Sequence, residues 1–349
     1  MNGKLWLRKW KILIADKNDN EALNVSELHC TFEVHKSRDK NGFYATCKIY
    51  NLTAATEKQL IDEGDRLIIE AGYSTTVQEQ ANVDSSENVL TNEQANAAAA
   101  SGQPVSSKTV DVELQYGKIF DGQIIWSSRS KESNVDYVLS LTAIDGDSPL
   151  HLNFITKTVN KGLNQRQALQ IVCDSSEKKI PAGAGTITDG LSMQALPRGK
   201  VFFGDPTDYI ADICRGNAAD YYIEDGNLHI TRLQDISNNE ALVVTPDTGL
   251  IGMPQQTQFG VSFRLLLNPS IHLGTLIKLK NSEVNEAQVS PGQPQTPLDD
   301  EWIYRVTSLT HSGDTRGTNW YTDCQGISRY GKGTLPAMLA SSKNNGMGV

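Results

Sequence analysis

The chain has 349 residues, of which 38% are hydrophobic and 21% charged, and this predicts a soluble globular protein of two or three domains. The formal net charge of -9 argues against a protein that binds nucleic acid through clustered Lys and Arg. No long apolar stretch follows residues 1–10 before the polar segment 16–20. The sequence therefore predicts neither a signal peptide nor membrane insertion.

The cysteines argue against a disulfide framework and against a zinc site. There are 5 of them, an odd number, and no two stand close together. This spacing is typical of a protein made in a reducing compartment. The residues concerned are Cys30, Cys47, Cys173, Cys214 and Cys324.

Residues 1–150 are predicted to form a first β-barrel domain. Apolar and polar residues alternate strictly in 28–35, 44–50 and 135–143, which is the pattern of half-buried strands. Thr53 can cap a helix over 54–63, and Gly64 fits the left-handed residue that ends it.

The segment 74–110 interrupts this first domain. It contains no aromatic residue and is rich in Gln, Asn, Ser and Ala, so it buries too little apolar surface to order itself. We expect a mobile insertion that the fold does not need. The strands that flank it, 66–72 and 112–120, should be neighbours in one sheet.

Residues 151–245 are predicted to form a small α+β region. A capping-box pattern at Asn164 and Gln167 opens a helix near 164–178. Asp205 and Pro206 are typical of the start of a second helix, near 205–215. The pair Asp225-Gly226 lies between two short apolar segments and predicts a tight hairpin over 221–230.

Residues 246–336 are predicted to form a second β-barrel domain of the same plan as the first. Alternation returns in 259–267, 276–279, 302–310 and 320–327. A loop over 281–300 again lacks aromatic residues, and 337–349 form a polar tail. In both halves the order is strand, long loop, strand, tight turn and strand, which indicates a duplication.

Several segments resemble the baseplate hub proteins of contractile-tailed phages, and together they span most of the chain. Each alone is a generic strand and turn pattern; their order carries the resemblance. The segments are Lys48–Thr53, Gly64–Tyr73, Ile119–Ile124, Leu141–Asp147, Gly199–Gly204, Tyr222–Leu228, Gly249–Pro254 and Leu267–Ile271.

The resemblance implies a structural subunit of a phage or phage-like tail, with two tube-like β-barrels per chain. Three copies would form a ring that adapts the sixfold tail tube to the threefold central spike. The implied partners are the chain itself as a homotrimer, the tail tube protein, the central spike protein and other baseplate proteins. DNA would pass through the lumen without specific binding. The protein would be assembled in the host cytoplasm and located in the virion.

Four candidate sites for chemistry have simpler interpretations. Asp145-Gly146-Asp147 lacks the spacing of a calcium loop and is typical of a turn. Cys30 lies on the strand face opposite His29 and His35, so a buried core cysteine is favoured over a nucleophile pair. Gly183, Gly185 and Gly190 do not have the spacing of a dinucleotide-binding motif. His229 and His272 have no ligand partner nearby in sequence.

No catalytic, cofactor-binding or metal-binding residue is predicted, and we expect the protein not to be an enzyme. An acidic pair for glycoside hydrolysis is not ruled out by counting carboxylates, so a tail-associated hydrolase is a weaker alternative. A β-rich adhesin is the stronger alternative. It should expose aromatic residues at its loop tips, whereas both long loops contain none.

Overall fold

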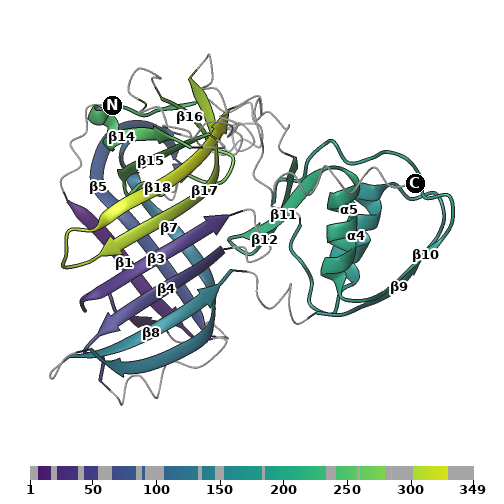
Figure 1. Ribbon diagram of the computed structural model, residues 1–349, viewed down its shortest axis with the longest axis horizontal. Coiled ribbons are helices and arrows are strands. Elements are labelled where there is room, and N and C mark those ends of the chain that lie inside the picture. Colours follow the sequence, from purple (N-terminus) through teal and green to yellow (C-terminus); the bar gives the residue numbers. More distant parts are fainter. Residues whose placement is uncertain are drawn as a thin grey trace, which may run out of the picture.

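The computed structural model has a β body and, beside it, a smaller unit built around two helices (Figure 1). The expected fold class, mainly β with a small α+β region, is confirmed. The predicted helix over 54–63, the tail 337–349 and most of the loop 281–300 lie outside the described residues. Those residues are 7–16, 22–37, 43–53, 65–83, 89–90, 106–132, 136–145, 153–182, 185–232, 241–257, 260–279, 284 and 302–328.

The β body is one sheet of 14 strands. Eleven of them are hydrogen bonded in the order β14-β15-β18-β17-β3-β4-β8-β7-β5-β1-β2, while β16 pairs with β17 and β13, and β6 pairs with β5. Hydrogen-bonded pairing among the described residues closes neither half into a barrel. The strands are β1 Arg8–Ala15, β2 Ala22–Asn24, β3 Cys30–Ser37, β4 Phe43–Tyr50, β5 Arg66–Val83, β6 Val89–Leu90, β7 Ser106–Lys131, β8 Tyr137–Ile144, β13 Leu242–Val243, β14 Leu250–Gln256, β15 Val261–Leu266, β16 Leu276–Lys278, β17 Ile303–Asp314 and β18 Trp320–Ser328.

The two halves of the sheet share one strand order, in keeping with the similar plan that the sequence predicts for them. The first module runs β3-β4-β8-β7-β5-β1, and the second runs β14-β15-β18-β17-β16-β13. Each has a bulge at the same place: between Ile124 and Trp126 on β7, and between Val306 and Ser308 on β17. The modules differ at the last strand, because β1 is antiparallel to β5 while β13 is parallel to β16.

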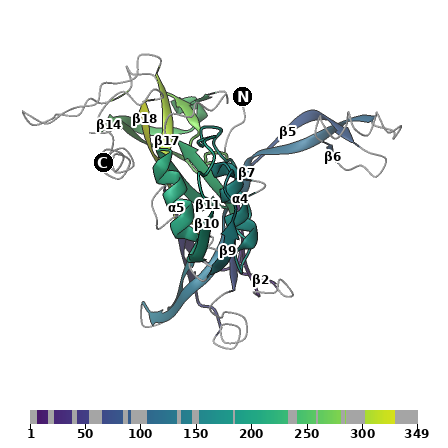
Figure 2. The same ribbon diagram turned by 90° about the vertical axis from the view of Figure 1, so that its right-hand side faces the viewer.

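The strands β5 and β7 extend further than the sequence predicts. Their ladder continues through the segment expected to be a loop, up to the pair Val83 and Ser106, and Figure 2 shows the resulting arm projecting from the body. Ladder hydrogen bonds join backbone groups, so a segment of mostly polar sequence can still pair. The predicted neighbours in one sheet are confirmed, and the rest of the insertion, at 84–88 and 91–105, lies outside the described residues.

The smaller unit contains α4 (Gln165–Ser175) and α5 (Pro206–Gly216), with β9 (Ile155–Val159) paired to β10 (Lys200–Gly204). The capping box at Asn164 and the Asp205 cap are both present, so both helices begin where the sequence predicts. β11 (Ala219–Glu224) and β12 (Asn227–Arg232) form the predicted hairpin. Both turn residues have positive φ, 53° at Asp225 and 75° at Gly226, as the tight turn requires.

Three clusters of buried side chains form the hydrophobic core. One belongs mainly to the first module, one mainly to the second and one to the α+β unit. The first two are interleaved, because the first contains Leu267 and Trp320 while the second contains Phe43. We propose the division into domains at about residues 150 and 245 on the strength of these clusters.

Candidate functional surfaces

The two modules are joined by direct pairing of β17 with β3. The ladder runs from Ser308 opposite Ser37 to Asp314 opposite Thr31. The first half of β17 pairs with β16 on the same side, so β17 has two successive neighbours along this edge. The junction therefore makes the two halves one sheet.

Trp320, the first residue of β18, anchors this junction in the core of the first module. Its ring is fully buried and lies edge-on to Trp10 at 5.9 Å and Phe32 at 5.5 Å. Its indole N–H donates to the Gly72 carbonyl at 3.3 Å. Arg8 donates to the carbonyl of Gly317 at 2.7 Å, in the turn before β18. A ring from the second module thus completes the first module's core.

One face of the sheet is polar across the strands β15, β18, β17, β3, β4 and β8. Along these strands alternate side chains are buried, and those between them face away from the core. The polar positions continue from strand to strand, because the register places them opposite one another. They are Ser262, Arg264, Tyr321, Asp323, Gln325, Ser308, Thr310, Ser312, Asp314, Thr31, Glu33, His35, Tyr44, Thr46, Lys48, Tyr50, Ser140 and Thr142.

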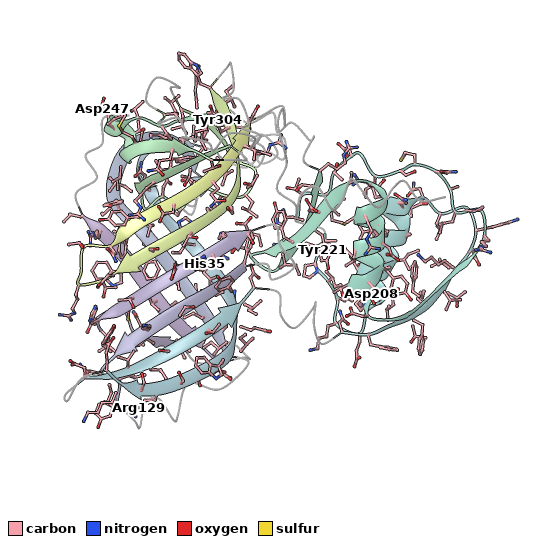
Figure 3. The ribbon with its side chains drawn as sticks, in the orientation of Figure 1. His35, Arg129, Asp208, Tyr221, Asp247 and Tyr304 are labelled. Atoms are coloured by element: carbon pink, nitrogen blue, oxygen red, sulfur yellow. The ribbon has the colours of Figure 1, made fainter. Side chains whose placement is uncertain are left out.

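Cross-strand contacts order this polar face. His35 stacks on Tyr44 with ring centroids 4.6 Å apart, and its Nδ1 lies 3.0 Å from the Thr310 hydroxyl across the module junction. His35 is labelled in Figure 3, midway along the β body. Arg264 donates to both carboxylate oxygens of Asp323, at 2.7 and 3.0 Å. A bidentate pair of this kind fixes side-chain geometry on an otherwise exposed surface.

A buried ion pair holds the α+β unit against the module junction. The ammonium of Lys36 on β3 donates to Oε1 of Glu224 on β11 at 2.8 Å, and His272 Nδ1 lies 3.0 Å from the same oxygen. Burial opposes ionisation of Glu224, but the His272 hydrogen bond and the Lys36 charge outweigh it and lower the pKa of Glu224 to about 2. Because the three residues come from β3, β11 and the loop before β16, this cluster ties the α+β unit to both modules.

Asp145 caps the β11–β12 turn. Its carboxylate accepts the backbone N–H groups of Asp225 at 2.6 Å and Gly226 at 3.1 Å. Burial raises the pKa of Asp145 to about 7, against the effect of these two hydrogen bonds. The turn predicted from the sequence at this aspartate is confirmed for Asp145, while Gly146 and Asp147 lie outside the described residues.

Among the strand edges of the body that have no strand partner within the described residues, two lie far apart along the strand order. One is the end of β7 beyond its bulge, which pairs only with β8, and the other is the outer edge of β14, where the strand order begins. Figure 3 shows Arg129, on the first edge, and Asp247, just before β14, at opposite ends of the body. Large apolar side chains are exposed beside both edges: Ile125 by 37%, Trp126 by 53%, Tyr137 by 44% and Met253 by 59%.

The cysteine and histidine candidates have structural surroundings. Cys30 is fully buried, and burial raises the pKa of its thiol to about 12, so it is a core cysteine as predicted. His29 lies on the other face, stacked on Tyr50 and 2.9 Å from Asp314. His229 stacks on Tyr222. Sequence reasoning missed the partner of His272, because Glu224 is far away along the chain.

The glycine at position 185 has a packing explanation. A Cβ at Gly185 would collide with the Leu228 carbonyl, which accounts for a glycine there without a nucleotide; Gly183 lies outside the described residues. In the described part of the chain, no three His, Cys, Asp or Glu side chains gather as metal ligands. No helix among the described residues is long and apolar enough to span a membrane.

A family model matches most of the chain. The model of a family described as baseplate hub gp41 matches residues 15–290. A search of curated protein sequences returned no match.

Solved structures that resemble this chain include tail proteins and a component of a secretion system. The 43 kDa tail protein of prophage MuSo2 from Shewanella oneidensis has 8% identity and a TM-score of 0.49, covering 93% of this chain and 99% of that one. A tail protein from Neisseria meningitidis MC58 has 9% identity and a TM-score of 0.49, with 95% and 100% covered. The E. coli c3393 protein, described as a component of the type VI secretion system, has 11% identity and a TM-score of 0.49, with 95% and 80% covered.

Proposed function

The chain belongs to the baseplate hub gp41 family, and from this premise we propose that it is the structural hub subunit of a phage or phage-like tail, acting as a homotrimeric ring. The ring adapts the sixfold tail tube to the threefold central spike. Its partners are the tube protein, the spike protein and neighbouring baseplate proteins. It is assembled in the host cytoplasm, and it uses no catalytic residue, cofactor or metal.

The observation that carries the proposal is the repeat of one strand order, with the bulge at the same place, within a single sheet. A chain with two similar modules presents two similar surfaces. Three such chains around one axis present six, which is the number that a sixfold tube requires. The repeat thus gives a structural reason why a trimer can contact a hexameric ring.

The polar face of the sheet is suited to line the channel of this ring. It consists largely of Ser, Thr, Tyr and His, and its acidic residues Glu33, Asp314 and Asp323 outnumber Arg264 and Lys48. Binding to DNA phosphates depends on clustered Lys and Arg. A hydroxyl-rich surface with little net charge would let DNA pass without holding it.

The mass of the protein in solution tests the ring. We expect light scattering after gel filtration to give three times the chain mass of 38.3 kDa, either for the protein alone or once tube and spike proteins are added. A chain that stays monomeric in the presence of both partners would contradict the proposal. Stripping proteins from the outside of intact tails supplies a second test. A hub should stay with the particle, whereas an adhesin should be removed.

A further inference from the structure

We propose that the end of β7, residues 126–131, pairs with β14 of a second copy of the chain and repeats between copies the β17·β3 junction found within one. This inference rests on the proposed ring function and names the strand edges that join the copies. In the shared strand order, β7 corresponds to β17 and β14 corresponds to β3. The internal junction is therefore a template for the external one.

The bulges fix which residues of β7 and β17 correspond. On β7 the bulge lies between Ile124 and Trp126, and on β17 it lies between Val306 and Ser308. A backbone bond confirms this alignment: Ile124 N–H donates to the Asp65 carbonyl at 2.7 Å, and Val306 N–H donates in the same way to Thr275 at 3.0 Å. Trp126 thus corresponds to Ser308. Four residues further along, Ser130 corresponds to Ser312.

The ladders across each module then align β3 with β14. In the first module, Thr142 on β8 lies opposite Trp126, the residue after the bulge. Thr142 also lies opposite Thr46 on β4, and Thr46 lies opposite Glu33 on β3. In the second module, Gln325 on β18 lies opposite Ser308, the residue after the bulge. Gln325 also lies opposite Ser262 on β15, and Ser262 lies opposite Gln255 on β14. Glu33 therefore corresponds to Gln255.

This correspondence sets the register between two copies. Within the chain, Ser312 lies opposite Glu33 and Thr310 lies opposite His35. Ser130 of one copy therefore lies opposite Gln255 of the other, and Ser128 lies opposite Thr257. Ser130 and Gln255 are both exposed, and both belong to the described residues.

The hydrogen bonds of the internal β17·β3 junction show which of these residue pairs have closely spaced side chains. Thr315 N–H donates to the Cys30 carbonyl at 3.0 Å, which marks a hydrogen-bonded position of the β17·β3 ladder. Hydrogen-bonded and non-hydrogen-bonded pairs alternate along an antiparallel ladder. Three steps away, Ser312 and Glu33 form a non-hydrogen-bonded pair, whose Cα atoms lie about 4.5 Å apart. The Ser130–Gln255 pair inherits this close spacing, which is within the range of a disulfide.

The hairpin tips give a second reason to expect a copy of the same chain. Asn51 N–H donates to the Tyr137 carbonyl at 2.8 Å, and Leu267 N–H donates to the Trp320 carbonyl at 3.2 Å, so Tyr137 and Trp320 correspond. Trp320 is buried in the other module, whereas Tyr137 is 44% exposed. The two open edges lie at opposite ends of the body (Figure 3), and a head-to-tail contact of this kind can close into a ring.

Disulfide trapping tests the register. The full-length variant Ser130→Cys with Gln255→Cys should form covalent trimers on mild oxidation, seen on a non-reducing gel. The matched control, Ser128→Cys with Gln255→Cys, places the thiols on diagonal positions about 7–8 Å apart and should cross-link far less. The native cysteines are all buried and do not compete. Ser128→Cys with Thr257→Cys is a second in-register pair, for use if the first variant does not fold.

The outcomes separate this inference from the proposed function. If the protein is a trimer by light scattering but the in-register variant cross-links no better than the diagonal control, the proposed register is wrong and the proposed ring is unaffected. Ladders longer than three, or covalent dimers that never proceed to trimers at full oxidation, support the edge pairing and overturn the threefold ring. A folded chain that neither cross-links nor associates, with or without its partners, overturns both. Covalent trimers formed only by the in-register pairs support both.

Discussion

The β17–β18 and β7–β8 hairpins occupy the same place in the two modules, but their surroundings differ. The first packs on the neighbouring module, where Trp320 is fully buried between Trp10 and Phe32. The second ends in solvent within a single chain, where Tyr137 is 44% exposed. Both hairpins have the same register and the same bulge. What lies beside a hairpin therefore decides its burial, and its own pattern does not.

The comparison also separates an internal interface from an external one. The internal junction is supported by a strand ladder, a buried indole and the Lys36–Glu224 ion pair. The open edges have unpaired strand backbone and exposed apolar side chains, but no buried indole and no ion pair of this kind among the described residues. The following variants test the difference, beginning with the largest expected effect.

Trp320→Ala should lower the free energy of unfolding by about 3–5 kcal/mol, because it leaves a cavity between two aromatic rings and removes the hydrogen bond to the Gly72 carbonyl. The matched change at the other hairpin, Tyr137→Ala, should cost less than about 1 kcal/mol in the isolated chain. Urea unfolding followed by circular dichroism, at concentrations below self-association, measures both. Equal losses of unfolding free energy at the two positions would contradict the difference in burial between the two hairpins.

Glu224→Gln should lower the free energy of unfolding by about 3 kcal/mol at pH 7, because it leaves the Lys36 ammonium buried without its counter-charge. The pKa of Glu224 is about 2 in the folded chain, against a usual value of 4.5. Its stabilising effect is therefore present above pH 4.5 and is lost as the pH falls toward 2.

The gap between wild type and Glu224→Gln should accordingly narrow below pH 4.5, measured by urea unfolding at a series of pH values. Asp212→Asn is a suitable control, since it removes an exposed pair with Arg215 and should change stability little at any pH. A gap that stayed constant down to pH 2 would mean that the ion pair is not what fixes the α+β unit to the junction.

Trp126→Ala should leave the stability of the isolated chain within about 0.5 kcal/mol, because the ring is 53% exposed there. If the β7 edge is an interface, the dissociation constant of the trimer should rise at least about tenfold, or 1.4 kcal/mol, as measured by sedimentation. Met193→Ala, which removes a side chain that is 79% exposed on the α+β unit, is the control. Unchanged association in Trp126→Ala would remove this hairpin from the interface.

The sequence by itself determined the local elements of this protein. Alternation placed the strands, because each half-buried strand must turn every second side chain to the core. The caps at Asn164 and Asp205 set the helix starts, and Asp225-Gly226 set a tight turn, because these depend on neighbouring residues alone. The repeat of one strand order was also visible, since it is an order of local patterns.

Only the tertiary structure decided how these elements meet. The β17·β3 ladder joins residues far apart in the chain through backbone groups that every sequence has, so no residue pattern marks it. The same holds for the extension of β5 and β7 into a polar segment. Glu224 found Lys36 and His272 because folding places three distant segments side by side at one point, where burial makes a charge require a partner.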